Sequence, residues 1–531
     1  MAQKLETLNL DLNNEESKSS SYGSQSNTDD ACLIPESNFT LHLSHNEYIE
    51  LNSDLFSQSS YLISLDLSNN KIRKINANSF ENMVNLKYLN LENNQLVKIN
   101  ACTFSGLSCL KVLNLSQNKI SQINIAAFRV LKNIETLNLS INIINKLYVN
   151  IFQGLDSMQT LKLDRNNIDC LKANTFNGLS SLHTLDLSRN KISKISDKTF
   201  RVLANVKCLN LSKNEIEQIN TNLFHELVNL EDLDLNRNKI GELSSHLFKS
   251  CSRLKQLDLG WNELKEIKEN SFESLVHLKY LNLSRNAISQ INSEAFRPLI
   301  RLEKLNLGWN KLQEIKKNTF HVLTNLKEML LWKNEIRFVD ENALCDLNSL
   351  EVLDLHNNQI SEINQNTWKG LNSLQKLYLD GNRIETIRSH TFYGLMCLKE
   401  LYLHKNNLNT IFADGFQGLN SLEKLDLKSN KILTITYNAP NKFKVLDLNQ
   451  NKILDLDRLL TNLIILETNH STIDPENRIA RLNSHDDKNN SNIRESLDHE
   501  LIISEPHFGT RRGKRSVKQQ VNYFFKKLNE V

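Results

Sequence analysis

The chain has 531 residues, of which 40% are hydrophobic and 24% charged, and its formal net charge is +3. This nearly balanced charge lacks the strong basic field of nucleic-acid-binding proteins, so no nucleic-acid partner is predicted. With 14 glycines and 5 prolines, the chain is poor in the residues that usually form turns, and it is rich in asparagine instead.

Residues 1–37 combine a partial repeat with a low-complexity segment. "LETLNLDLNN", from Leu5 to Asn14, precedes the serine-rich "NEESKSSSYGSQSNTDD". The N-terminus lacks the apolar run of a signal peptide, and no transmembrane segment is predicted because no apolar stretch is long enough. Two alternatives stay open for this end: a cytosolic protein, or a fragment that has lost a signal peptide and a cap.

From residue 38 to residue 469, the chain is a tandem repeat of about 18 units. Sixteen 24-residue units run without insertion from Asn38, and a shorter unit and a partial one follow at Leu422 and Phe443. "LHTLDLSRNKISKISDKTFRVLAN", Leu182–Asn205, is typical. Its L-x-L alternation predicts a short strand with one buried face. One unit cannot bury its apolar side alone, so the units must stack, with their strands parallel in one sheet.

The ninth place of every unit is asparagine. A buried asparagine can hydrogen-bond backbone groups at a bend that neither helix nor sheet satisfies. We therefore predict a structural asparagine ladder formed by Asn70, Asn94, Asn118, Asn142, Asn166, Asn190, Asn214, Asn238, Asn262, Asn286, Asn310, Asn334, Asn358, Asn382, Asn406 and Asn430.

The eighth place carries a cation or a tryptophan in eight consecutive units. Exposed aromatic side chains framed by arginine are typical of binding hot spots. We expect the Arg285 guanidinium to lie between the two indoles in a cation–π sandwich, because neighbouring units are roughly 4.8 Å apart. The alternative is a duplicated phrase, since "LGWN" occurs twice. The column comprises Arg165, Arg189, Lys213, Arg237, Trp261, Arg285, Trp309 and Lys333.

The fifth place predicts two further features of the exposed sheet face. An acidic stripe is expected to neutralise part of the basic column, and an aromatic pair, Tyr378 and Tyr402, is expected to join the ligand-binding surface. Small residues at the seventh place, Gly260 and Gly308, are expected to give the indoles room. The stripe runs through Asp186, Asn210, Asp234, Asp258, Asn282 and Asn306.

The chain shows no catalytic or metal-binding motif, so we predict a non-enzymatic protein without cofactor or metal. There is no C-x-x-C, no G-x-S-x-G and no phosphate-binding glycine loop. The eight cysteines do not face each other in neighbouring units, so all are predicted to be free thiols.

After the repeats, residues 470–510 are polar and predict a flexible tail. Residues 511–531 begin with "RRGKR" and predict a basic amphipathic helix. This helix would cap the last repeat, or dock a partner or an anionic membrane.

The repeat resembles the leucine-rich repeat family in its 24-residue subclass, which includes Toll-like receptor ectodomains and chaoptin-like and Slit-like proteins. The resemblance implies an α/β-type solenoid shaped as a horseshoe, with the parallel sheet on the concave face and an irregular or short-helical convex side. It also implies a receptor-like or adhesion-type binder of a protein ligand, possibly glycan-bearing, at the cell surface or outside the cell. The alternative is a cytoplasmic leucine-rich repeat scaffold. The ligand and the oligomeric state stay undetermined.

Overall fold

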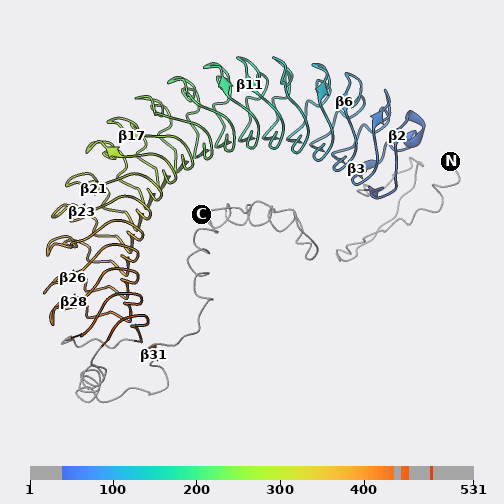
Figure 1. The fold of residues 1–531 in the computed structure, drawn as a ribbon. Coiled ribbons are helices and arrows are strands. Elements are labelled where there is room, and N and C mark those ends of the chain that lie inside the picture. Colours follow the sequence, from blue (N-terminus) through green and yellow to red (C-terminus); the bar gives the residue numbers. More distant parts are fainter. Residues whose placement is uncertain (1–38, 436–443, 454–478, 482–531) are drawn as a thin grey trace, which may run out of the picture. The chain divides into compact units, whose positions relative to one another are not determined.

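The computed structural model describes residues 39–435, 444–453 and 479–481. The segments expected at residues 1–37 and 511–531 lie outside these ranges, as does most of the polar tail. Within the described residues the chain forms a solenoid in which each repeat makes one turn. The turns are stacked in chain order (Figure 1).

One strand from each turn joins a single 19-stranded parallel sheet. All of its strands but the last follow the repeat's L-x-L phrase, where alternate side chains are buried. The last of them lies within the segment expected to be a tail. The strands are β1 (Phe39–His42), β3 (Leu62–Asp66), β5 (Tyr88–Asn90), β7 (Val112–Asn114), β9 (Thr136–Asn138), β10 (Thr160–Lys162), β12 (Thr184–Asp186), β14 (Cys208–Asn210), β15 (Asp232–Asp234), β16 (Gln256–Asp258), β18 (Tyr280–Asn282), β20 (Lys304–Asn306), β22 (Glu328–Leu330), β24 (Val352–Asp354), β25 (Lys376–Tyr378), β27 (Glu400–Tyr402), β29 (Lys424–Asp426), β30 (Val445–Asp447) and β31 (Ile479–Arg481).

The pairing register confirms the 24-residue period. Thr160 pairs with Thr136 on one side and with Thr184 on the other. Equivalent residues of successive units are therefore direct neighbours in space, one strand spacing of about 4.8 Å apart.

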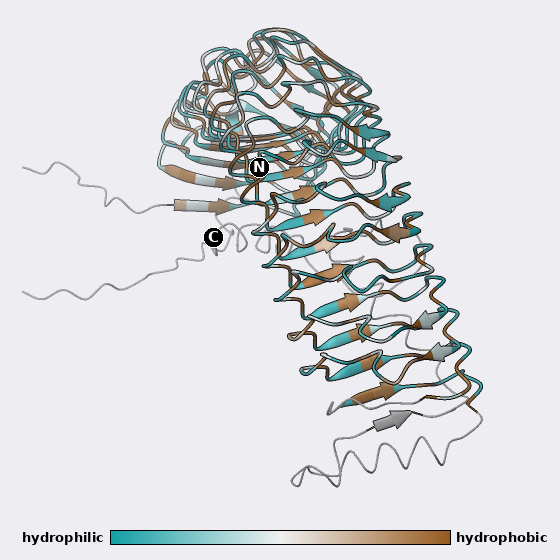
Figure 2. Ribbon diagram, turned by 90° about the vertical axis from the view of Figure 1, so that its left-hand side faces the viewer, coloured by the Kyte–Doolittle hydropathy of each residue, from teal (hydrophilic) through white to brown (hydrophobic). Residues whose placement is uncertain are grey.

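The opposite side of each turn is irregular, with one 3-10 helix (Ser53–Phe56) among the described residues. The short helices that the resemblance allowed on this side are otherwise replaced by turns and by pairs of two-residue strands, which Figure 2 shows across the turn from the main sheet. These strands are β2 (Glu50–Leu51), β4 (Lys74–Ile75), β6 (Lys98–Ile99), β8 (Gln122–Ile123), β11 (Cys170–Leu171), β13 (Lys194–Ile195), β17 (Glu266–Ile267), β19 (Gln290–Ile291), β21 (Glu314–Ile315), β23 (Phe338–Val339), β26 (Thr386–Ile387) and β28 (Thr410–Ile411).

The core between the two sides consists of leucine layers and a column of aromatic rings. Phe128, Phe152 and Phe176 are fully buried, and their rings stack with centroids 6.3 and 6.2 Å apart. Trp368 takes the same place in its unit and stacks on Phe392 at 6.4 Å. Each ring thus buries its faces against the neighbouring units, and the units depend on each other for their core.

The asparagine ladder has the predicted position and role. The Nδ2 of Asn262 donates to the carbonyls of Leu235, Leu259 and Gly260 at 3.0, 3.1 and 3.2 Å. Its Oδ1 accepts from the backbone N–H of Ile240 at 3.0 Å. One amide therefore satisfies backbone groups of two successive turns. The ladder asparagines named above are all buried except Asn286, which is half-buried.

Candidate functional site

The eighth place of each unit adopts the left-handed backbone conformation, which the sequence analysis did not predict. Arg237, Trp261, Arg285 and Trp309 have φ angles of 54°, 53°, 54° and 54°. Asparagine and glycine tolerate this conformation best, whereas other residues lose roughly 1–2 kcal/mol in it. Several other units do carry the tolerant types at this place: Asn69, Asn93, Asn357 and Gly381.

Five eighth-place residues form a continuous stack, which we call the cation–aromatic ladder: Arg237, Trp261, Arg285, Trp309 and Lys333. The Cζ of Arg285 lies 4.1 Å from the Trp261 ring centroid and 4.5 Å from that of Trp309. Arg237 covers the other face of Trp261 at 4.4 Å, and the Nζ of Lys333 lies over Trp309 at 4.2 Å. The predicted position of Arg285 between the two indoles is therefore confirmed. The stack also extends beyond this sandwich by one cation at each end.

Backbone hydrogen bonds fix the spacing of this ladder. The N–H of Trp261 donates to the carbonyl of Ser284 at 2.8 Å, and that of Arg285 donates to Gly308 at 2.8 Å. The same bond joins each eighth place to the seventh place of the next unit. The ladder is thus rigid at its base, while the residues Trp261 and Trp309 remain 36% and 39% exposed.

The two glycines lie against side chains of neighbouring units. A Cβ on Gly308 would lie 2.5 Å from Cε2 of Trp332, so this glycine makes room for the indole of the following unit. A Cβ on Gly260 would meet the side-chain amides of Asn236 and Asn282 instead. The contact could not be expected from "LGWN" alone, because Trp332 belongs to the next unit.

Trp332, at the seventh place, extends the aromatic edge and was missed in the sequence analysis. Its indole is almost buried, meets Trp309 edge-to-face at 6.1 Å, and stacks on the His356 imidazole at 5.6 Å. The sequence signal was a change along the seventh place, from serine, asparagine and glycine to tryptophan and histidine.

The acidic stripe has a structural role that was not predicted. In thirteen turns the Oδ1 of a fifth-place Asp or Asn accepts the backbone N–H two residues later, as Asp234 does from Asn236 at 2.9 Å and Asn282 from Ser284 at 3.0 Å. This bond holds the end of the strand as it enters the left-handed turn.

The acids of the stripe also carry less negative charge than exposed carboxylates would, so they do not simply neutralise the basic column. Burial, reinforced by the neighbouring Asp258 carboxyl, raises the pKa of Asp234 to about 7, and it raises that of Asp232, at the third place of the same unit, to about 6. Burial likewise raises the pKa of Asp186 and Asp258. Asn210 and Asn306 of the stripe carry no charge at all.

The predicted tyrosine pair exists, and it replaces the hydrogen-bonding residue of the fifth place. The rings of Tyr378 and Tyr402 stack with centroids 4.7 Å apart and an interplanar angle of 13°. The Tyr402 hydroxyl donates to Glu400 at 2.6 Å and accepts from Lys424 at 3.1 Å. Burial opposes the charge of Glu400, but these bonds and the ion pair with Lys376 hold its pKa below the usual value.

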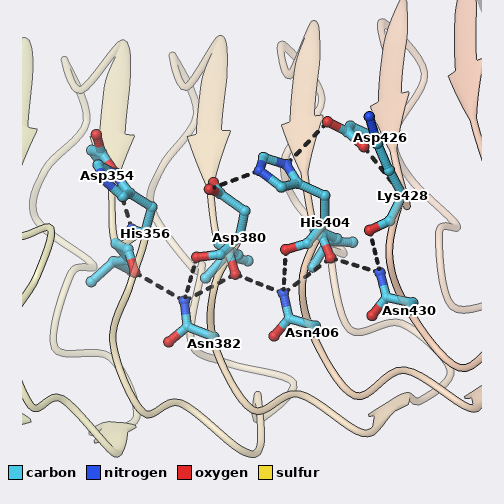
Figure 3. A network of polar contacts seen from close by, with 12 residues as sticks. Asp354, His356, Asp380, Asn382, His404, Asn406, Asp426, Lys428 and Asn430 are labelled. Atoms are coloured by element: carbon cyan, nitrogen blue, oxygen red, sulfur yellow. Dashed lines mark hydrogen bonds and ion pairs between the residues drawn. The ribbon is translucent and has the colours of Figure 1, made fainter. Parts of the chain in front are cut away.

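A second polar group beside the tyrosines was missed in the sequence analysis (Figure 3). His404 lies between two carboxylates, with Nε2 3.2 Å from Asp380 and Nδ1 3.0 Å from Asp426. Burial opposes the charge of Asp426, but His404 lowers its pKa overall. These residues are neighbours only because the units stack, since His404 lies 24 positions after Asp380 and 22 positions before Asp426 in the chain.

Arg165, Arg189 and Lys213 continue the eighth-place column in the same backbone conformation, with φ of 54°, 53° and 54°. The structure therefore brings all eight predicted column residues into one line. The tyrosine pair lies farther along the sheet, on β25 and β27.

The predicted free thiols are confirmed for the seven cysteines that the structure describes: Cys102, Cys109, Cys170, Cys208, Cys251, Cys345 and Cys397. Cys32 lies outside the described residues. In the described part of the chain no group of three or more His, Cys, Asp or Glu side chains is placed to hold a metal ion. No helix in the same residues has the length and apolarity needed to cross a membrane.

Comparison with known families identifies the class of the protein. The leucine rich repeat model matches at residues 40–96, 85–144, 132–192, 180–240, 229–288, 252–312, 276–336, 324–384 and 373–432. The chain therefore belongs to the leucine-rich repeat family, as the repeat predicted. No curated protein sequence matches it significantly.

Several solved structures share the fold. Toll from the Drosophila Toll–Spatzle complex is 24% identical with a TM-score of 0.60, over 73% of this chain and 50% of the Toll chain. A leucine-rich repeat protein of Leptospira interrogans is 24% identical with a TM-score of 0.55, over 85% and 97%. InlJ of Listeria monocytogenes is 21% identical with a TM-score of 0.51, over 71% and 74%. The chain thus spans about half of Toll, and these likenesses concern the fold.

Proposed function

We propose that this chain is a non-enzymatic protein-recognition solenoid of the receptor-like type. In this proposal the sheet forms the concave face of a horseshoe, and the partner docks on the sheet and on the cation–aromatic ladder at its edge. The observation that carries the proposal is the ladder itself, a rigid and partly exposed stack of two tryptophans and three cations.

The backbone conformation supports a role in binding. Arginine, lysine and tryptophan occupy a left-handed position where asparagine or glycine would be more stable. Each cation–π contact returns only about 0.5–1 kcal/mol at an exposed site, which does not exceed the conformational cost. These side chains therefore do not serve stability, whereas their aromatic and cationic groups are of the kinds that dominate binding hot spots.

Rigidity supports the same conclusion. Tryptophan and arginine dominate binding hot spots, and a side chain that is already ordered loses less entropy when the partner binds. Arg285 is held between two rings, and the backbone beneath it is hydrogen-bonded to the next unit.

The ladder is unsuited to single-stranded nucleic acid, which agrees with the absence of a nucleic-acid partner predicted above. Proteins that bind single strands stack bases on open aromatic faces. Here a cation covers each face of Trp261, at 4.4 and 4.1 Å, and each face of Trp309, at 4.5 and 4.2 Å. A base has no ring face to stack on.

A second candidate function, a cytoplasmic scaffold that uses the same surface, is favoured by the thiols. Cys102, Cys109 and Cys397 are free and exposed, and free thiols are typical of a reducing compartment. Alkylation of free thiols in cells that produce the protein distinguishes the two candidate functions. Eight alkylated cysteines favour the scaffold, and oxidised cysteines favour the receptor-like protein.

Site-specific photocrosslinking in an extract of the source organism tests the proposed function. A photoreactive amino acid replaces Glu263, which is exposed two residues after Trp261, or Arg129, which is exposed on the turn after Phe128. We expect protein adducts from position 263 only, and we expect Arg285→Ala in the same chain to abolish them without loss of the fold. Equal adducts from both positions would contradict the proposal.

A further inference from the structure

The exposed parts of the cation–aromatic ladder limit the chemistry of its partner. Both faces of Trp261 and Trp309 are covered by cations, so their exposed area is edge rather than face. Sugar rings bind tryptophan mainly through the ring face, as nucleic-acid bases do. An indole edge instead offers a narrow apolar strip between two charges, which suits an aliphatic or proline side chain.

The cations of the ladder suit carboxylates. A guanidinium keeps a full positive charge and five N–H donors, and that of Arg285 is held 4.1 and 4.5 Å from the centroids of two rings. The charge of Arg285 therefore attracts a carboxylate of the partner in addition to its contacts within the chain. The half-buried Asp234 of the neighbouring sheet opposes an anionic partner less than an exposed carboxylate would, since burial raises its pKa to about 7.

The spacing of the cations indicates which backbone conformation the partner adopts. Arg237 and Arg285 lie 4.4 and 4.1 Å from the opposite faces of Trp261, so their guanidinium groups are about 8–9 Å apart. Arg285 and Lys333 flank Trp309 in the same way, at 4.5 and 4.2 Å. Side chains on one face of a β-strand repeat at about 6.8 Å, and i, i+4 side chains of a helix at about 6 Å. Every third residue of a polyproline II helix repeats at about 9.3 Å.

We propose that the ladder binds an acidic protein segment in the polyproline II conformation, with carboxylates at every third residue facing Arg237, Arg285 and Lys333. Apolar residues between the carboxylates then lie against the edges of Trp261 and Trp309. This inference rests on the proposed function and specifies the partner of the same surface.

Two synthetic peptides of equal composition and charge test the spacing. One repeats Glu-Pro-Pro, and the other repeats Glu-Glu-Pro-Pro-Pro-Pro, so that only the first places a carboxylate at every third residue. Each is titrated into the full chain at physiological salt and followed by tryptophan fluorescence and calorimetry. We expect the Glu-Pro-Pro peptide to bind at least about tenfold more tightly.

Variants of the chain show whether the ladder is the site. Arg285→Gln should weaken the Glu-Pro-Pro peptide at least about tenfold, Arg285→Lys should weaken it less because the charge remains, and Arg129→Ala should have no effect. Unchanged thermal unfolding of the Arg285 variants excludes misfolding as the cause.

Three results would overturn the inference: equal affinity for the two peptides, no binding of either, or tighter binding of a sulfated oligosaccharide or oligouridine at the same residues. If the peptides fail while position 263 still crosslinks to a protein, the recognition function stands and only the acidic polyproline II partner is refuted.

Discussion

At the scale of single residues, the ninth-place asparagine is the most constrained side chain of the repeat. Asn262 makes four hydrogen bonds to backbone groups of two turns. Asn262→Ala leaves those buried groups unpaired and should lower the free energy of unfolding by about 1–3 kcal/mol. The adjacent Glu263→Ala, on an exposed residue, should be nearly neutral. Urea titration of both variants provides the measurement. Equal unfolding midpoints would show that the ninth-place asparagine does not stabilise the fold in this way.

The fifth-place acids predict an unusual dependence of stability on pH. The pKa of Asp234 is raised to about 7 in the folded chain, mainly by burial. The ordinary pKa of this carboxyl is near 3.8. Between pH 3.8 and pH 7 the folded state therefore binds more protons than the unfolded state, so this residue makes the protein less stable as pH rises. Above pH 7 the full cost of the buried charge is present.

Asp234→Asn should remove this cost while preserving the turn, since Asn210 and Asn282 make the same backbone bond in other units. We expect a gain of roughly 1–3 kcal/mol at pH 8 and little change at pH 4. Thermal unfolding across this pH range measures it, with the exposed Asp156→Asn as control. A variant that is no more stable than the natural chain at pH 8 would contradict the burial argument.

At the scale of structural elements, the aromatic edge depends on a close approach between two turns. A Cβ on Gly308 would lie 2.5 and 2.6 Å from Cε2 and Nε1 of Trp332. Gly308→Ala should therefore displace the indole, cost roughly 1–3 kcal/mol, and alter tryptophan fluorescence. Gly241→Ala is the matched control, because nothing lies within 4 Å of its added Cβ. If the two variants unfold at the same denaturant concentration, the contact is not tight in solution.

At the scale of the whole molecule, the in-register stack makes the chain nearly one-dimensional. Excising one unit, Leu182–Asn205, would bring β10 beside β14 with the same register, so Thr160 would pair with Cys208. We expect this chain to fold and to melt within a few degrees of the full one. Excising half a unit, Leu182–Ser193, places turns opposite strands and should abolish cooperative unfolding. Circular dichroism distinguishes these outcomes.

The repeat architecture was predictable in detail because it is local. The L-x-L phrase, the phenylalanine of the nineteenth place and the ninth-place asparagine each recur every 24 residues, and period, sheet and ladder follow from them. The alignment of Arg285 between two indoles was also predictable, because stacking converts the same place in successive units into contact. Tyr378 and Tyr402 were found in the same way.

Other properties emerge only in the folded chain, because they depend on side chains from several turns at once. These are the position of Trp332 over Gly308, the bridge of His404 between Asp380 and Asp426, and the weak charge of Asp234. Which residues share a column was predictable from the sequence, because a fixed period needs no knowledge of distance. Their backbone conformation, burial and side-chain packing required the folded chain, because these arise where neighbouring turns compete for the same space.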